Sequence, residues 1–223
     1  MTEVSQLNNY HTTKDRINYM FYYVVRALLW LLLKVFWRME IIGIENLPES
    51  GGLIIASNHV SYLDPAVLAA SLNRKIYFIT KKEVFKNGFV SFILKNLNTI
   101  SVDRKNTDIL AFKKVINILR EGKILGIFPE GTRSLNGDLQ ELKLGAIRIA
   151  MKTGVPILPV GIIGTHKIYP RGIKFPILFK HKIIVKYGTP QYLNQLKSRD
   201  KIYQKEELNI LGNKIKELSA INT

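Results

Sequence analysis

A histidine and an aspartate lie five residues apart in residues 58–64 (NHVSYLD), and this pair has the residue types needed for general base catalysis. A loop of this length lets the Asp64 carboxylate fold back onto one imidazole nitrogen of His59 and leaves the other nitrogen facing a pocket. An imidazole oriented in this way accepts a proton from a hydroxyl group. A plainer alternative is that Asp64 caps a helix and His59 is a loop histidine that makes one hydrogen bond.

A second stretch with the residue types of a binding site is residues 129–134 (PEGTRS). Gly131 and Thr132 follow Glu130, and the backbone N–H groups of such a turn suit a developing oxyanion. The guanidinium fork of Arg133 suits a phosphate group, because it can donate two parallel hydrogen bonds to it. The alternative for this stretch is a surface turn in which Glu130 and Arg133 pair with each other.

Short apolar segments precede both stretches and predict buried strands. Residues 53–56 (LIIA) lead to His59, and residues 124–128 (ILGIF) lead to the second stretch. Asp64 and Pro65 are typical of a helix start, with the aspartate as N-cap and the proline at the first helical position. His59 therefore lies at the carboxyl end of a strand, where open α/β sheets keep their active sites.

Two more predicted strands end next to cations. Residues 75–80 (KIYFIT) lead to Lys82, and residues 99–102 (TISV) lead to Arg104. The other predicted elements are helices over residues 89–97, 107–120 and 142–152, a strand over 155–160 whose two prolines suit an edge or a bulge, a hairpin over 171–187 and an amphipathic helix over 199–218. Together these elements predict an α/β domain.

The amino-terminal segment, residues 19–37 (YMFYYVVRALLWLLLKVFW), is apolar except for Arg26 and Lys34. On a helical wheel these two cations lie about 80° apart among aromatic residues. The opposite, aliphatic face carries Phe21, Val24, Leu28, Leu31, Leu32 and Val35. Each central cation costs about 2.5 to 3.5 kcal/mol to insert into a bilayer, whereas each aliphatic residue returns only about 0.3 to 0.6 kcal/mol. We therefore predict that residues 13–38 lie in one leaflet, with the cations at the headgroup level. A core helix is the alternative.

The chain has 223 residues, no cysteine and a formal net charge of +16. This length suits one sizeable core, so we expect residues 1–40 to form a helical membrane anchor and residues 41–223 to form one catalytic α/β domain. The absence of cysteine excludes a thiol nucleophile, a thiolate metal site and disulfides. The positive charge indicates a polyanionic partner, either nucleic acid or an anionic membrane surface. The apolar amino end favours the membrane surface.

Taken in order, the motifs resemble the four motif blocks of the glycerolipid acyltransferase family, over about residues 40–190. The matching residues are Asn58, His59, Asp64 and Lys82, followed by residues 102–104 (VDR), 128–134 (FPEGTRS) and 155–160 (VPILPV). The combination of His-x-x-x-x-Asp with Glu-Gly-Thr-Arg is highly specific. The resemblance implies a mixed, largely parallel β-sheet covered by helices. It also implies an amino-terminal helical membrane-anchoring motif, frequently of two helices, to which residues 1–40 correspond.

The resemblance also implies an activity. A member of this family transfers a fatty acyl group from acyl-ACP or acyl-CoA to the sn-2 hydroxyl of 1-acyl-glycerol-3-phosphate (lysophosphatidic acid), giving phosphatidic acid. We expect this reaction at the cytoplasmic side of the cell membrane, with another lysolipid or an amino-lipid as alternative acceptors. No cofactor is expected, and no metal, because no His, Asp and Glu cluster in the sequence has ligand spacing.

Within that activity, the expected roles follow the chemistry of each residue type. His59 is the general base and Asp64 its orienter, so the acceptor hydroxyl attacks the thioester directly. This agrees with the lack of both cysteine and a Gly-x-Ser-x-Gly elbow. The expected acceptor-phosphate ligands are Lys82, Arg104 and Arg133, and the expected oxyanion or orienting residues are Glu130, Gly131 and Thr132.

Two other function classes remain open at this point. One is a non-enzymatic binder of an anionic membrane or of nucleic acid, which gives His59 no special role. The sequence offers no helix-turn-helix, aromatic-rich RNA platform or zinc module for it, so no nucleic-acid partner is expected. The other is a hydrolase in which the His-Asp pair activates water on an acyl thioester. Such an enzyme would cleave the thioester without an acceptor.

Overall fold

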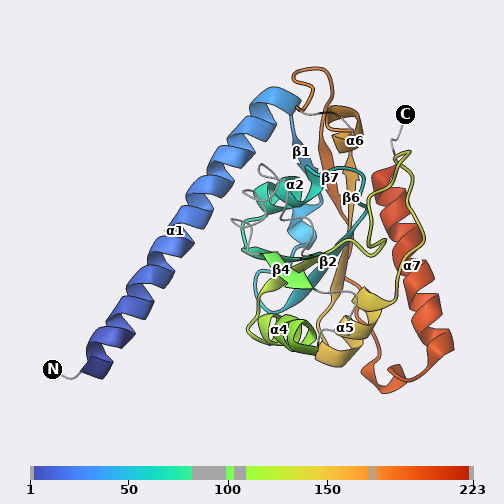
Figure 1. The fold of residues 1–223 in the computed structure, drawn as a ribbon. Helices are drawn as coiled ribbons and strands as arrows, with labels where there is room; N and C mark the ends of the chain where they lie inside the picture. The colour runs from blue at the N-terminus through green and yellow to red at the C-terminus, as the bar shows by residue number, and fades with distance from the viewer. Residues whose placement is uncertain (1–2, 82–98, 103–108, 171–172, 174, 221–223) are drawn as a thin grey trace.

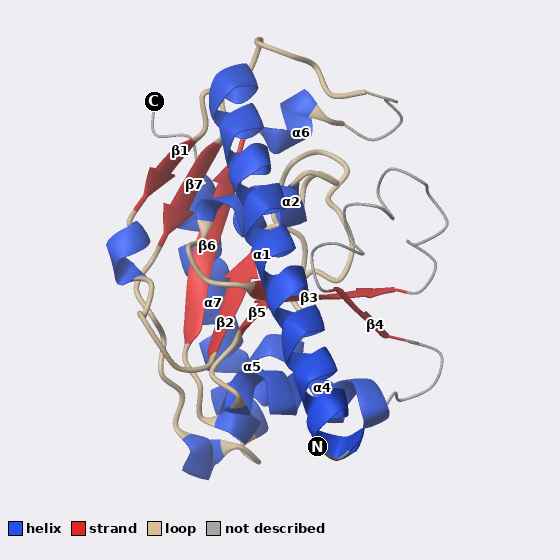
Figure 2. Cartoon of the chain, turned by 90° about the vertical axis from the view of Figure 1, so that its left-hand side faces the viewer, coloured by secondary structure: helices blue, strands red, loops and turns tan. Residues whose placement is uncertain are grey.

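The computed structural model describes residues 3–81, 99–102, 109–170, 173 and 175–220. Its strands are β1 (Glu40–Ile42), β2 (Leu53–Ser57), β3 (Ile76–Lys81), β4 (Thr99–Val102), β5 (Ile124–Ile127), β6 (Ile157–Ile163) and β7 (Ile184–Tyr187). In this part of the chain they form one sheet in the order β1-β7-β6-β2-β5-β3-β4 (Figures 1 and 2). Only β6 and β7 pair antiparallel among these strands, so the predicted mixed, largely parallel sheet is confirmed.

Helices cover both faces of the sheet (Figure 1). On one face lie α1 (Glu3–Trp37) and α2 (Asp64–Ser71), and on the other lie α4 (Ile109–Arg120), α5 (Gly145–Thr153) and α7 (Lys201–Ser219). The short helix α6 (Thr165–Ile168) follows β6, and two 3-10 turns, η1 (Ile44–Asn46) and η3 (Gln195–Lys197), lie in connections. The sheet therefore separates two hydrophobic cores.

Strand β2 contributes to both cores, which explains its central position. Leu53 and Ile55 pack in the core below α1 and α2, whereas Ile54 and Ala56 pack in the core below α4 and α5. An uninterrupted apolar run is the pattern of a parallel strand buried on both faces. Because β5 and β6 flank β2, the loop after β2 lies between the ends of two neighbouring strands.

Most elements expected from the apolar patterns are present with small shifts at their ends. Strands β2, β3, β4 and β5 correspond to the strands expected over residues 53–56, 75–80, 99–102 and 124–128. Helices α4, α5 and α7 correspond to the helices expected over residues 107–120, 142–152 and 199–218. The helix expected over residues 89–97 lies outside the described residues.

The structure corrects two expectations about the carboxyl-terminal half, the first of them only in part. The strand that begins near Val155 is not an edge strand, because β6 lies between β2 and β7. The alternative of a bulge is met, because Ile157 bridges Gln191 whereas Val160 pairs with Tyr187, so the partner segment has one extra residue opposite Leu158 and Pro159. The hairpin predicted over residues 171–187 is not found in the described part of that range, since β7 pairs with β6 and β1.

The amino-terminal segment is one helix over its described residues, not the two-helix appendage of the family. All six residues of the aliphatic face are exposed. The helix contains one apolar window, Met20–Trp37, with a mean hydropathy of 1.6, which is long and apolar enough to cross a membrane by length and composition only. Tyr22, Leu33 and Trp37 are buried on the opposite side, within the core below α1 and α2.

The cations of α1 contact backbone carbonyls, and the expectation that they lie at a headgroup level stays a prediction. The Arg26 guanidinium donates to the carbonyl oxygen of Leu72, at the end of α2, and the Tyr22 hydroxyl accepts from Ile76 N at 3.4 Å. Lys34 Nζ donates to the carbonyl oxygen of Met39 at 3.0 Å. The cations therefore cap backbone carbonyls of the folded domain, which a helical wheel alone does not reveal.

Candidate active site

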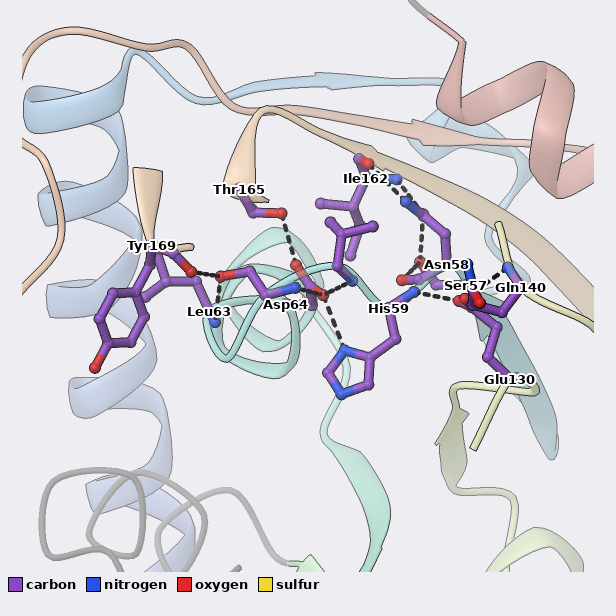
Figure 3. A network of polar contacts seen from close by, with 12 residues as sticks. Ser57, Asn58, His59, Leu63, Asp64, Glu130, Gln140, Ile162, Thr165 and Tyr169 are labelled. Carbon is purple, nitrogen blue, oxygen red and sulfur yellow. Dashed lines mark hydrogen bonds and ion pairs between the residues drawn. The ribbon is translucent and has the colours of Figure 1, made fainter. Parts of the chain in front are cut away.

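The predicted contact between His59 and Asp64 is confirmed. Nδ1 of His59 lies 2.9 Å from Oδ2 of Asp64, and the imidazole's other nitrogen points away from the carboxylate (Figure 3). The Asp64 side chain is fully buried, whereas the His59 side chain is 17% exposed. The Phe128 ring stacks on the imidazole with 4.1 Å between centroids. The imidazole is thus held at one edge and one face, with one nitrogen left for chemistry.

Asp64 does not cap helix α2, contrary to the expectation from its position before Pro65. The helix begins at Asp64 itself, and the Oδ2 atom accepts from the backbone amides of Val60 and Ser61 at 2.7 Å each. These donors precede Asp64 in the chain, so the carboxylate closes the loop of residues 58–64, here called the catalytic loop, instead of capping the helix. An ionised carboxylate only accepts hydrogen bonds, which assigns the proton of neutral His59 to Nδ1 and the lone pair to Nε2.

Residues from β6 and α6 hold the same loop from the other side (Figure 3). The Thr165 hydroxyl donates to Asp64 Oδ1 at 2.7 Å. The Asn58 side chain donates to the Ile162 carbonyl at 2.9 Å and accepts from Ile162 N at 2.8 Å. Sequence reasoning assigned no role to Thr165, although its position directly after an apolar strand was a signal that could have identified it.

Glu130 connects the two stretches that were identified from the sequence. Its Oε1 atom accepts from His59 N at 2.6 Å and its Oε2 atom accepts from Gln140 N at 2.9 Å, while Ser134 N donates to the His59 carbonyl at 2.8 Å. Burial raises the pKa of Glu130, and these two backbone donors partly offset that effect. Glu130 therefore binds backbone amides, and the alternative of a surface pair with Arg133 is wrong.

The next two residues of the turn, Gly131 and Thr132, are those expected to serve the oxyanion or to orient the substrate. Gly131 adopts a left-handed backbone conformation, with φ of 71°, that favours glycine. Its N–H donates to the Phe128 carbonyl at 3.0 Å, which closes the turn. The expected oxyanion role of Gly131 stays a prediction. Thr132 is exposed, and its part in orienting substrate stays a prediction.

The Arg133 guanidinium lies beside the catalytic loop and stacks on Tyr62, a residue to which the sequence analysis assigned no role. The Cζ atom of its guanidinium is 3.3 Å from the centroid of the Tyr62 ring, and both side chains are half-buried. Stacking on an aromatic face fixes the plane of the guanidinium. The other two predicted phosphate ligands, Lys82 and Arg104, lie outside the described residues.

No group of three or more His, Cys, Asp or Glu side chains in the described part of the chain could hold a metal ion. The expectations of no metal and no cofactor stay predictions. What the described residues bring together is a proton acceptor at His59 Nε2 and, on the adjoining turn, the guanidinium of Arg133.

Comparisons with known proteins point to one family. An acyltransferase family model matches residues 38–163. The 1-acyl-sn-glycerol-3-phosphate acyltransferase of Borreliella burgdorferi is 34% identical over 62% of this chain and 56% of its own length. A probable 1-acyl-sn-glycerol-3-phosphate acyltransferase of Mycoplasma genitalium is 30% identical over 77% of this chain and 69% of its own length. The chain spans about half the length of several curated relatives that it matches.

A solved structure covers nearly the whole chain. The crystal structure of the 1-acyl-sn-glycerophosphate (LPA) acyltransferase PlsC from Thermotoga maritima matches 94% of this chain and 84% of that chain, with a TM-score of 0.72 and 25% sequence identity.

Proposed function

The chain belongs to the acyltransferase family, and we propose that it transfers a fatty acyl group from an acyl thioester to the sn-2 hydroxyl of 1-acyl-glycerol-3-phosphate, giving phosphatidic acid. The observation that carries this proposal is the 2.9 Å contact between His59 Nδ1 and the fully buried Asp64 carboxylate. The names of the relatives support lysophosphatidic acid as the acceptor.

In the proposed reaction, His59 Nε2 takes the proton of the acceptor hydroxyl as its oxygen attacks the thioester carbonyl. A tetrahedral intermediate forms and then collapses with cleavage of the carbon–sulfur bond. The imidazolium returns the proton to the departing thiolate, so the products are the new ester and a free thiol. Asp64 orients the imidazole and stabilises its positive charge during the reaction, and no acyl-enzyme is formed.

We assign the acceptor phosphate to the guanidinium of Arg133, with Lys82 and Arg104 as further ligands from other strand ends. Arg133 stacks on Tyr62, and Tyr62 belongs to the catalytic loop, so the guanidinium contacts the same segment that carries the general base. A phosphate bound there would bring the rest of a glycerolipid to the exposed edge of the imidazole. Binding of the non-reacting part of a substrate is a common means of positioning the reacting group.

The direct test uses the purified full chain with a panel of acceptors. Acyl-CoA and acyl-ACP are each supplied with lysophosphatidic acid, with lysolipids that lack a terminal phosphomonoester and with an amino-lipid, and products are identified by mass spectrometry. We expect phosphatidic acid from lysophosphatidic acid, with either donor or with both. Thioester cleavage without an acceptor would instead identify a hydrolase, and no turnover with any acceptor would overturn the proposal.

We further propose that the chain works at the cytoplasmic membrane surface, held in one leaflet by α1. The aliphatic face of α1 is exposed although its residues are large and apolar. Burying one such side chain stabilises association by about 1.5 to 3 kcal/mol, a contribution that salt does not screen. Binding to nucleic acid depends mainly on ionic contacts and is lost as salt rises.

Liposome flotation tests this location. We expect association with anionic vesicles to persist at about 1 M salt, where the Debye length is about 3 Å. The double variant Leu28→Glu and Leu31→Glu should lose it, whereas Leu196→Glu, at a residue that is 95% exposed on η3, should not. Ser5→Cys and Glu45→Cys should both react with an impermeant label from the cytoplasmic side. Labelling of one of them only from the opposite side would show that the helix crosses the membrane.

A further inference from the structure

The second carboxylate oxygen of Asp64 has a hydrogen-bond donor of its own. Thr165 Oγ1 lies 2.7 Å from Asp64 Oδ1, and both side chains are fully buried (Figure 3). We propose that Thr165 is a positioning residue, which acts on the reaction through Asp64 and thereby sets the orientation and basicity of His59. This inference rests on the proposed function of the His59–Asp64 pair.

The fold brings Thr165 to Asp64 although the two residues are 101 positions apart in the chain. Strand β6 pairs directly with β2, so the chain leaves both strands at the same edge of the sheet. Gly164 then turns the chain with φ of 93°, and a Cβ atom there would collide with the Lys182 carbonyl oxygen. This turn makes Thr165 the first residue of α6. A glycine is needed at this corner to direct the threonine hydroxyl inward.

The rest of the β6–α6 segment holds the catalytic loop in the same way. The Asn58 side chain spans the Ile162 backbone, and the Ser61 hydroxyl donates to the Tyr169 carbonyl at 3.0 Å. These contacts fix the backbone on both sides of His59. Thr165 differs from them because its hydroxyl donates to the Asp64 carboxylate, which in turn contacts the His59 imidazole.

The effect on chemistry follows from where the donors of Asp64 lie. Oδ2 accepts from His59 Nδ1, Val60 N and Ser61 N, whereas the donor to Oδ1 among the described hydrogen bonds is Thr165. A donor to an ionised carboxylate stabilises the charged form. Removing the Thr165 hydroxyl therefore leaves Asp64 more basic and held through Oδ2 alone. A more basic Asp64 stabilises protonated His59, so the base would be inactive up to a higher pH.

Two other titratable groups interact with the His59–Asp64 pair, and their effects on its titration must be distinguished from that of Thr165. Glu130, from the turn after β5, accepts from His59 N, and its charge interacts with both His59 and Asp64. His166, on α6, also interacts with the Asp64 charge, and burial lowers its pKa. His166→Asn in the background of each variant removes one of these titrations, and Glu130 is unchanged throughout the series.

The test compares Thr165→Val, which removes the hydroxyl at nearly constant shape, with Thr165→Ser, which keeps it. We expect the valine variant to lose about 10- to 150-fold in kcat, the range of one hydrogen bond to a charged group, with KM unchanged. Its acid limb of activity should move to higher pH, and the serine variant should recover most of both effects. Thr153→Val is the matched control, because its hydroxyl donates to a carbonyl of its own helix at 2.7 Å, away from the site.

A second measurement does not depend on turnover. The His59 imidazole is titrated by NMR in the full chain, with its signals identified by their loss in His59→Gln. A midpoint that moves up in Thr165→Val and returns in Thr165→Ser supports the proposal even if no acceptor is acylated, a result that would refute the proposed function alone. Valine and serine variants with equal kcat and equal His59 midpoints would overturn the positioning role.

Discussion

The catalytic loop after β2 and the turn after β5 lie at neighbouring strand ends, yet they are held in different ways. The loop is fixed by side chains that reach it from distant parts of the chain, and its carboxylate is fully buried. The turn is closed by its own backbone, and its arginine lies half-exposed on the face of Tyr62. The difference corresponds to two demands: proton transfer needs a fixed geometry, whereas an acceptor headgroup needs an accessible site.

Removing the base should give the largest effect, because nothing else in the described site replaces it. We expect His59→Ala and Asp64→Ala to lower transferase turnover by about 10² to 10⁴-fold, the usual contribution of general base catalysis. The two variants should still unfold cooperatively in a thermal melt. Near wild-type turnover in His59→Ala would show that the loop has no catalytic role and would remove the contrast with the turn.

Arg133→Ala should come next, because it removes a binding contact and leaves the base in place. A charge-assisted hydrogen bond to phosphate contributes about 1.5 to 3 kcal/mol, so kcat/KM for lysophosphatidic acid should fall about 10- to 150-fold. Acceptors without a phosphomonoester should be affected much less. Arg120→Ala, at an exposed residue at the end of α4, is the matched control. Equal losses for all acceptors would assign Arg133 to structure.

A smaller loss is expected when the support of Arg133 is removed instead of the arginine. A cation–π contact contributes about 0.5 to 2 kcal/mol, so Tyr62→Leu should raise KM for lysophosphatidic acid about 2- to 30-fold with little change in kcat. Tyr62→Phe keeps the ring and should behave like the wild type. A fall in kcat alone would mean that Tyr62 serves the catalytic loop and not the turn.

Much of the loop and its surroundings is predictable because it depends on local sequence. The apolar run from Leu53 predicts a strand buried on both faces, and the short spacing to Asp64 predicts its contact with His59. The contact from Thr165 is not predictable in this way, because it depends on β6 lying beside β2. The same holds for the contact of Arg26, because its partner, the Leu72 carbonyl, follows α2 and is not part of a helical wheel of residues 19–37.

The smallest predicted effect concerns Glu130, which joins the two regions through His59 N and Gln140 N. Burial raises the pKa of this carboxyl, so the folded state favours its protonated form. Its contribution to stability should be fully present below the ordinary glutamate pKa of about 4.3 and be lost as pH rises through the higher folded pKa. The free energy of unfolding of the wild type and of Glu130→Gln is measured with denaturant across pH 4 to 8. We expect the stability of the wild type relative to the variant to decrease toward neutral pH. A constant difference would contradict the prediction.

Helix α2 has a further consequence, because its two ends have different neighbours. Asp64 is its first residue, and the carbonyl just beyond its last turn, that of Leu72, accepts from Arg26 of α1. Eight helical residues span about 12 Å, so α2 is a spacer of defined length between α1 and the general base. If the aliphatic face of α1 rests in a leaflet, α2 helps to fix the position of His59 relative to the lipid surface, through the Arg26–Leu72 contact at one end and Asp64 at the other. The length of α2 would then determine how far a lysolipid headgroup must rise from the bilayer to react.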